Sequence, residues 1–285
     1  MTDMKNLYFL VSVLAVAAGC CSEPQDGYEF TWKKHVIDGH ITGVTAANAD
    51  NVAEAFGTVE DGVYTAPNGK VFKCGAAPAA AYDMLAVQPQ MSDLKQVIGF
   101  CEEPMASRRP ESNLSDWAAD MLLEAVSEVT GRKADFSVIN FGGIRTSLGV
   151  GEVLKDDLVS MFPFKNYVSY VRLSGKDVKT IFERFASGRV EAFGGARLVV
   201  EDGKISSLEI GGKPFDERKE YALATIDFLL DGGDGHNLAK NAKELIITDI
   251  KVGDVMLEKA KAFAPSPIAY QVDGRYQVIP KEKAE

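Results

Sequence analysis

Three short segments of the sequence combine glycines with side chains that could hold a ligand. They are Asn140-Phe141-Gly142-Gly143-Ile144-Arg145, Pro163-Phe164-Lys165-Asn166 and the stretch from Asp227 to Gly235. Glycine lets the backbone turn sharply and approach a ligand closely. An arginine just beyond such a turn presents a planar fork of N–H donors that matches phosphate oxygens. The segments therefore offer the elements of a phosphate-bearing ligand site.

The second and third segments also have side chains suited to the rest of such a ligand. Phe164 and Phe228 stand beside turn signals, where an aromatic ring can offer its face to a flat ring. Asp234, between two glycines, could accept hydrogen bonds from two neighbouring hydroxyls of a ribose. Taken singly, these residues have ordinary explanations, since Gly-Gly pairs and Asp-Gly are typical of turns and a phenylalanine near a strand end is typical of a core.

In their order along the chain, the segments resemble the C-terminal domain of the 5′-nucleotidase family, which includes bacterial UDP-sugar hydrolases and animal ecto-5′-nucleotidase. That family carries Asn-Gly-Gly-Gly-Ile-Arg, then Pro-Phe-Gly-Asn, then Asn-Phe followed by Gly-Gly-Asp-Gly. The segment Arg108-Arg109-Pro110-Glu111-Ser112 resembles its Arg-x-x-Glu-Ser, and Gly151-Glu152-Val153 stands where the family has Gly-Asp-Ile. The resemblance runs from about Val97 to Ala269.

The resemblance implies a role for each matching residue. Phe164 and Phe228 would sandwich a nucleobase, Asn140 would touch the base edge and Asp234 would bind the ribose hydroxyls. Arg108 and Arg145 would meet the phosphates through charge-assisted hydrogen bonds. Arg109 is the alternative to Arg108, because the assignment depends on counting back from Glu111.

Two positions depart from the family pattern. Phe141 replaces the first glycine of the triplet and Lys165 replaces the glycine after Pro-Phe, so the backbone there cannot freely take positive φ. The Phe141 ring is expected to crowd or extend the base pocket. His236 follows Gly-Gly-Asp-Gly where many relatives have Tyr or Phe, which the pattern tolerates.

The elements that must position these segments read as a layered α/β domain with mixed α+β layers. Leu114 to Gly131 has the apolar spacing of a helix, with Ser115 as its cap and Gly131 at its end. Ser174 with Asp177 can cap a second helix, on which Val178, Ile181, Phe182 and Phe185 share one face. Strands are expected at 136–140, 167–173 and 221–226, and a hairpin at 197–200 and 205–210.

The region before this domain divides into three parts. Residues 1–21 read as a lipoprotein signal peptide, since the apolar run is about the 7–15 residues of such a leader and shorter than a membrane-spanning helix. Small residues lead into Cys20, the expected lipidation site. Residues 22–30 form a polar tether, and 31–95 an extension of short strands and turns, with a turn at Pro67-Asn68-Gly69 and no assigned role.

From these features we expect a protein of the cell envelope, tethered to a membrane by lipid alone on its periplasmic or outer-membrane face, with a plainly secreted protein as the alternative. The C-terminal domain is expected over 96–285. Cys74 and Cys101 could form a disulfide or be two unrelated buried thiols.

Composition limits the partners. The formal net charge of −10 argues against a nucleic-acid surface, because phosphate backbones are met by clustered lysines and arginines. An anionic ligand must therefore be held by a few local arginines.

Family members hydrolyse through a separate N-terminal metallophosphatase domain with two metals. This sequence has only His35, His40 and His236, none in a motif of that domain, and Asp38-Gly39-His40 only superficially echoes its Asp-x-His. We therefore expect no metal ligand, cofactor or catalytic residue here, with divalent metals in a separate metallophosphatase partner. The leading hypothesis is the nucleotide-recognition half of a split 5′-nucleotidase. The alternatives are a non-catalytic nucleoside- or nucleotide-binding lipoprotein and an interaction module whose pocket has decayed.

Overall fold

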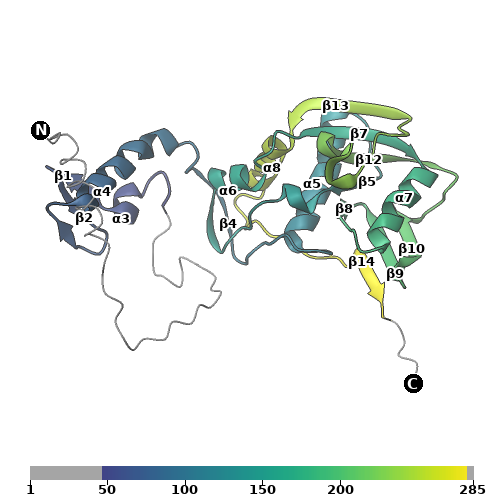
Figure 1. Ribbon diagram of the computed structural model, residues 1–285, viewed down its shortest axis with the longest axis horizontal. Helices are drawn as coiled ribbons and strands as arrows, with labels where there is room; N and C mark the ends of the chain where they lie inside the picture. The colour runs from purple at the N-terminus through teal and green to yellow at the C-terminus, as the bar shows by residue number, and fades with distance from the viewer. Residues whose placement is uncertain (1–46, 281–285) are drawn as a thin grey trace, which may run out of the picture. The chain divides into compact units, whose positions relative to one another are not determined.

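The computed structural model describes residues 47–280, which belong to one unit of the chain, Thr45–Glu285 (Figure 1). Several predicted features lie outside the described residues, namely the signal peptide, the lipidation site at Cys20, the polar tether and the first part of the extension. His35 and His40 lie there too. Within 47–280, no helix is both long and apolar enough to cross a membrane.

Residues 47–95 contain more helix than the sequence suggested. The turn at Pro67-Asn68-Gly69 is confirmed, with Gly69 at φ 79° before strand β3. The expectation of strands and turns alone was wrong, because two helices stand among the strands. In the longer one, α4, alanines dominate and Pro78 lies in the first turn, and both are favourable to a helix. The elements are α3 (Val52–Phe56), β1 (Thr58–Glu60), β2 (Val63–Thr65), β3 (Val71–Phe72), α4 (Ala76–Val87) and η1 (Gln88–Met91).

The central element of the domain is a five-stranded sheet in the order β13-β7-β12-β5-β8. Strand β12 runs parallel to β5 and antiparallel to β7, and the outer strands β13 and β8 are antiparallel to their neighbours. The expected strands at 136–140, 167–173 and 221–226 are all confirmed. The strands are β5 (Phe136–Ile139), β7 (Tyr167–Ser174), β8 (Ala192–Gly194), β12 (Glu220–Ile226) and β13 (Glu244–Lys251).

Two helices cover opposite faces of this sheet. Along β5, Ser137 donates its hydroxyl to the Ala119 carbonyl of α5 (Asn113–Thr130), at 2.6 Å. Phe136, the preceding residue, packs instead on Phe182 of α7 (Gly175–Ala186), with ring centres 5.6 Å apart. Because successive side chains of a strand point to opposite faces, α5 and α7 lie on the two sides of the sheet. The expected α/β layers are thereby confirmed.

Local sequence signals account for both helices. In α7, the Ser174 hydroxyl accepts a hydrogen bond from the Asp177 N–H, as expected, and the predicted apolar face is buried. In α5, the end at Gly131 is confirmed, with φ 64°, but the expected cap was wrong. Ser112 is the N-cap, and Ser115 lies one turn inside the helix, where its hydroxyl accepts the Ser112 N–H at 3.0 Å.

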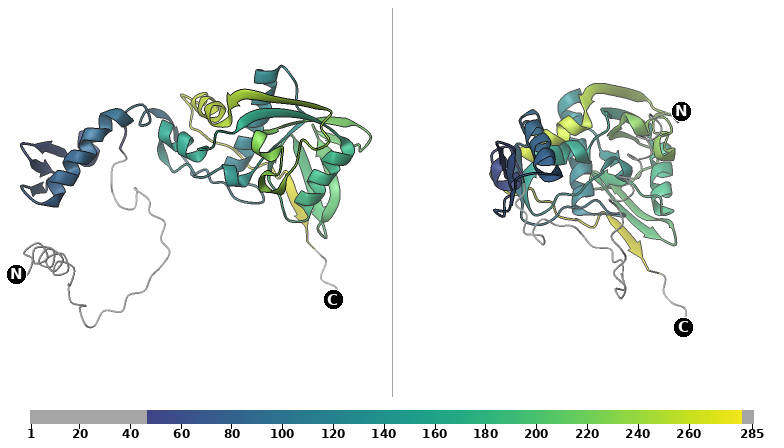
Figure 2. Two further views of the ribbon diagram at one scale, coloured as in Figure 1. Left: turned by 45° about the horizontal axis from the view of Figure 1, so that its top comes forward. Right: turned by 60° about the vertical axis from the view of Figure 1, so that its left-hand side comes forward.

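A second sheet carries the predicted hairpin, β9 (Ala196–Glu201) and β10 (Lys204–Ile210). Asp202 and Gly203 both take positive φ at its turn, as a two-residue hairpin turn requires. The sheet order is β11-β10-β9-β14, and β14 (Tyr276–Ile279), near the end of the described chain, runs parallel to β9 (Figure 2). The other elements are β4 (Val97–Cys101), β6 (Gly151–Leu154), α6 (Lys155–Met161), β11 (Lys213–Pro214) and α8 (Val252–Lys261).

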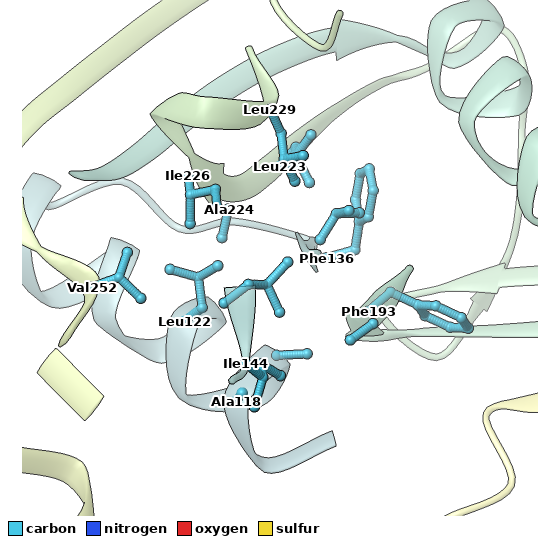
Figure 3. Close-up of a cluster of buried hydrophobic side chains, with 14 of the residues drawn as sticks. Ala118, Leu122, Phe136, Ile144, Phe193, Leu223, Ala224, Ile226, Leu229 and Val252 are labelled. Carbon is cyan, nitrogen blue, oxygen red and sulfur yellow. The ribbon is translucent and has the colours of Figure 1, made fainter. Parts of the chain in front are cut away.

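The core between these layers is apolar and aromatic. Figure 3 shows Leu122 of α5 directed toward Ala224 and Ile226 of β12. On the other face, Phe182 contacts Phe136, Phe185 and Phe193 with ring centres 5.5 to 5.7 Å apart. Burial on this scale stabilises each side chain by about 1.5–3 kcal/mol relative to exposure. Cys74 and Cys101 are both free thiols, so the disulfide alternative was wrong. The expectation of two buried thiols is confirmed for Cys101 and was wrong for Cys74, which is exposed.

Partly buried carboxylates in α5 and just before it bind the C-terminal segment. The Glu111 carboxylate accepts the N–H groups of Gly274, Arg275 and Tyr276 at 2.7, 3.1 and 3.2 Å. The buried Arg275 guanidinium donates to Asp120 of α5 at 2.8 and 3.0 Å. The Glu-Ser motif therefore serves, in this fold, as an anchor for the strand that ends the domain.

Asp116 lies inside this network beside Glu111 and Asp273, with one oxygen of each within 4.8 Å of the others. The positive charge at this place is Arg275, whose Nε lies 3.0 Å from Asp273 and 3.7 Å from Asp116. Burial raises the pKa of Asp116 to about 7, against the opposing effect of Arg275, and Glu111 adds to the rise. In the folded state, Asp116 therefore stays protonated at pH values between about 4 and 7, where a free aspartate is ionised.

We expect the replacement Asp116→Asn to change the pH dependence of stability. In the unfolded chain the pKa of an aspartate is about 3.9. The native state therefore binds more protons between there and the folded pKa of about 7, so Asp116 contributes stability at low pH that is lost as pH rises through that value. Relative to the wild-type protein, D116N should gain on the order of 2 kcal/mol between pH 5 and pH 8 in urea unfolding. A difference independent of pH would contradict the raised pKa.

Candidate functional site

The sheet topology brings the three glycine-bearing segments to one edge. Strands β5 and β12 are parallel, so their carboxyl ends, which lead into Asn140 and Asp227, lie at the same edge. Strand β7 is antiparallel to β12, with Val168 opposite Ile226, so the start of β7 lies there too. The segment 163–166 immediately precedes that start. Three segments spread over almost a hundred residues thus form one site.

A hydrogen bond links the first and third segments. The Asn140 side-chain amide donates to Asp234 Oδ2 at 2.6 Å. Asn140 is 4% exposed, whereas Asp234 is exposed, so the aspartate reaches the surface from a buried support. A side chain at Gly143 would put its Cβ 2.8 Å from Asn140 Oδ1, which is why glycine is needed there. The structure thus gives Asn140 a contact with Asp234, and its contact with a base edge stays a prediction.

Phe164 and Arg145 form the second link, between the first and second segments. The guanidinium carbon of Arg145 lies 5.9 Å from the centre of the Phe164 ring. Arg145 also donates to the Gly142 carbonyl at 3.1 Å. The Phe164 ring is 48% exposed and borders a hollow of only about 10 Å³, so a flat ligand would lie on the surface against this ring. The exposed ring and its arginine are arranged for stacking beside an anion.

Phe228 is presented by a turn that is tied to strand β7. Asp227 Oδ1 accepts the N–H groups of Tyr167 at 2.8 Å and of Phe228 at 3.0 Å. This carboxylate joins the start of β7 to the end of β12, and therefore the second segment to the third. Leu229 is fully buried, whereas the Phe228 ring is 44% exposed. Among the aromatic contacts of residues 47–280, none joins Phe164 to Phe228, and a clamp formed by the two rings stays a prediction.

Phe141 does not lie where the sequence suggested. Its ring is 7% exposed and packs under Arg109, whose guanidinium carbon is 4.6 Å from the ring centre. Its N–H donates to Glu191 Oε2 at 2.7 Å. The expectation that this ring crowds or extends the base pocket was wrong, because Glu191 and Arg109 retain Phe141 in the core. Neither Phe141 nor the exposed Lys165 has a positive φ, so the missing glycines cause no backbone strain.

The two candidate arginines of the Arg-x-x-Glu-Ser segment differ in what they contact. Arg109 donates to the Val190 carbonyl at 2.9 Å and to Glu191 at 2.8 and 3.0 Å. Arg108 is exposed, and its guanidinium makes no hydrogen bond or ion pair with any residue of the described chain. Of the two arginines, Arg108 is therefore the one whose guanidinium is available to a phosphate. No contact joins it to the other five residues, so its place in the site stays a prediction.

The matches to known proteins agree with this geometry. A family model described as the 5′-nucleotidase C-terminal domain matches residues 97–241. This chain belongs to the 5′-nucleotidase C-terminal domain family. The structure continues beyond the matched region, since β13 completes the five-stranded sheet and α8 and β14 follow it.

Relatives and solved structures of this family share the same region. The chain is 33% identical to Protein UshA of Escherichia coli over 157 residues, which cover 53% of this chain and 28% of that protein. It is 32% identical to a 5′-nucleotidase of Vibrio cholerae over 146 residues, 50% of this chain and 26% of that one. The fold matches a 5′-nucleotidase precursor from Thermus thermophilus with a TM-score of 0.62 at 22% identity, over 72% of this chain and 43% of that chain. The matched region thus spans about a quarter of the curated relatives' length.

His236 follows the Gly-Gly-Asp-Gly segment of this family member as a buried residue. It is 3% exposed, and its ring meets Phe185 edge to face at 6.3 Å. Burial, followed by the charges of Arg184 and Arg189, lowers its pKa to about 4. His236 is therefore neutral near pH 7 and takes the place of an aromatic core residue, as the family pattern allows.

Sequence reasoning missed Glu191, which supports the first segment. It lies just before β8, and because β8 is antiparallel to β5, its start lies at the same sheet edge as the end of β5. No motif marks this residue. The one hint in the sequence is Phe141 itself. A phenylalanine in place of the family's glycine needs other residues to accommodate its ring.

We expect Glu191→Ala to destabilise the protein by about 1–3 kcal/mol, because the buried Phe141 N–H and the Arg109 guanidinium lose their acceptor. Urea unfolding followed by circular dichroism measures this. Glu217→Ala is the matched control, since Glu217 pairs with Lys179 on the exposed surface and should change stability little. An equal loss of unfolding free energy in the two variants would show that the Glu191 contacts stabilise the protein no more than an exposed ion pair does.

Proposed function

We propose that this chain is the nucleotide- or nucleoside-recognition half of a split 5′-nucleotidase in nucleotide catabolism, with hydrolysis supplied by a separate metallophosphatase. The observation that carries the proposal is the convergence at one sheet edge of two exposed phenylalanines and the Asn140–Asp234 pair. Family membership points to the same ligand class.

The base would stack between Phe164 and Phe228. Phe164 and Phe228 are 48% and 44% exposed, so the faces of both rings are accessible to a ligand. Stacking on such a ring contributes roughly 1–3 kcal/mol per base and is permissive for base type. Binding of several nucleosides is therefore expected.

The sugar and phosphates would meet the polar residues around the rings. Asp234 Oδ2 is taken by Asn140, and its exposed carboxylate remains available to accept from a pair of ribose hydroxyls. Arg145, beside Phe164, and Arg108 would bind the phosphates. Salt screens the attraction between these exposed arginines and a phosphate, so affinity for phosphate-bearing ligands should weaken as salt rises.

Hydrolysis would need a partner. The sequence holds three histidines, and the only one in the described residues is buried and neutral near pH 7, so we assign the divalent metals and the attacking water to a metallophosphatase that joins this chain. Lipidation at Cys20 would retain the pair at the cell envelope.

We expect the full chain to bind AMP, adenosine and UDP-glucose in isothermal titration calorimetry, and Phe228→Ala to weaken binding of each by at least about fivefold because one stacking face is lost. Tyr82→Ala is the matched control, because Tyr82 is an exposed aromatic in the extension. Absence of binding by the wild-type chain at millimolar ligand would remove the proposal. Equal affinities of F228A and the wild type would place the base elsewhere.

For the split enzyme, we expect release of phosphate from AMP only when the chain is combined with a metallophosphatase encoded beside it and with a divalent metal. Removal of the metal by a chelator, or replacement of the chain by F228A, should suppress the turnover. Binding of AMP without any turnover in the complete mixture would favour the alternative, a non-catalytic nucleoside- or nucleotide-binding lipoprotein.

A further inference from the structure

Arg184 of α7 reaches across to the turn that carries Asp234. Its guanidinium donates through Nη2 to the Asp234 carbonyl at 2.7 Å and through Nη1 to the Gly235 carbonyl at 3.0 Å. The two contacts join a helix on one face of the sheet to the loop after β12, fifty residues later in the chain. Neither the family motifs nor the helix pattern marks this arginine.

The turn needs such support because its backbone is unusual. Gly232, Asp234 and Gly235 all have positive φ, at 92°, 49° and 73°. Glycine takes this conformation freely, but for a residue with a side chain it costs about 1–2 kcal/mol. Asp234 is therefore the strained member of the turn, and it is also the residue proposed to bind ribose.

The hydrogen bonds of the turn leave two carbonyls for Arg184. Gly232 N–H donates to the His236 carbonyl, Gly235 N–H to that of Gly232 and His236 N–H to that of Gly233. Within the described residues, the carbonyls of Asp234 and Gly235 accept none of these backbone bonds. A planar fork with two N–H groups on one side meets adjacent carbonyls in a way that the single ammonium of lysine cannot.

The space around the guanidinium is equally specific. A Cβ at position 235 would stand 3.2 Å from Arg184 Nη2, so Gly235 allows the arginine to approach the backbone. Arg184 also lines a groove of about 620 Å³ between α7 and the loop that follows the turn, together with Arg189. Arg189 is exposed, and its guanidinium makes no hydrogen bond within residues 47–280.

We infer that Arg184 is a positioning residue for ribose recognition: it fixes the backbone of Asp234 while Asn140 fixes the carboxylate. The inference rests on the proposed function. The carboxylate is then oriented by two independent supports, one on its main chain and one on Oδ2. Removal of the Arg184 side chain should weaken the contact of Asp234 with ribose and leave the positions of the Phe164 and Phe228 rings unchanged.

The test compares ligands that differ only in the sugar. Calorimetric affinities for adenosine, 2′,3′-dideoxyadenosine and adenine are measured with the full wild-type chain, Arg184→Met, Arg184→Lys and the control Arg189→Met. We expect the wild type and R189M to prefer adenosine over the dideoxy compound, and R184M and R184K to lose about tenfold of that preference, the equivalent of one hydrogen bond to a charged group. Affinity for adenine should stay within about twofold.

A second measurement follows the turn in the free protein. Hydrogen exchange of the Gly235 and His236 amides, both bonded within the turn, should be faster in R184M than in the wild type or R189M. Unchanged exchange, or an unchanged preference for adenosine, would overturn the inference. So would an equal loss for adenine, which would indicate general disturbance by α7. If the wild-type chain binds none of the three ligands, the proposed function fails and the ribose role fails with it, while the exchange data still decide whether Arg184 holds the turn.

Discussion

The position of β12 between two neighbours of opposite direction decides where the three glycine-bearing segments lie. Its parallel pairing with β5 puts the ends of both strands at one edge, and its antiparallel pairing with β7 brings the start of β7 to the same edge. All residues of β12 except the first are buried, so a slip of one residue in register would exchange its two faces between α5 and α7. The same strand register that buries the core therefore also fixes the positions of the segments at this sheet edge.

Acidic side chains stabilise this arrangement by binding backbone groups. Asp227, Glu191 and Glu111 each accept N–H groups from segments 50 or more residues away. Such bonds to a charged acceptor stabilise by roughly 1.5–3 kcal/mol each. Part of the chain's acidic surplus thus holds loops in place, and the negative charge that argues against a nucleic-acid partner is in part structural.

The arginines divide in a complementary way. Arg109, Arg184 and Arg275 donate to carboxylates or carbonyls that lie far away in the chain. Arg145 donates to the nearby Gly142 carbonyl, and the Arg108 guanidinium makes no hydrogen bond within residues 47–280; both arginines are exposed. The replacement of a family glycine by Phe141 is accommodated in the same way, because Glu191 and Arg109 retain the new ring in the core. Phe141 is therefore buried, while Phe164 and Phe228 are exposed.

The sequence alone was sufficient for features that depend on residues near one another in the chain. The helix at 113–130, the cap at Ser174, the hairpin turn at Asp202-Gly203 and the three site motifs follow from local spacing and turn chemistry, because a helical face or a positive φ is a property of a few consecutive residues. The helix at 76–87 was also local, yet turn signals on either side of it concealed the alanine pattern.

Only the tertiary structure decided which side chains support the site. The burial of Phe141, the bond between Asn140 and Asp234, and the hold of Arg184 on the turn join residues 50 or 94 positions apart. A charged side chain binds a ligand or a backbone carbonyl according to which groups lie within about 3 Å of it. Strand order and helix packing decide which groups those are, so the local sequence pattern cannot predict them.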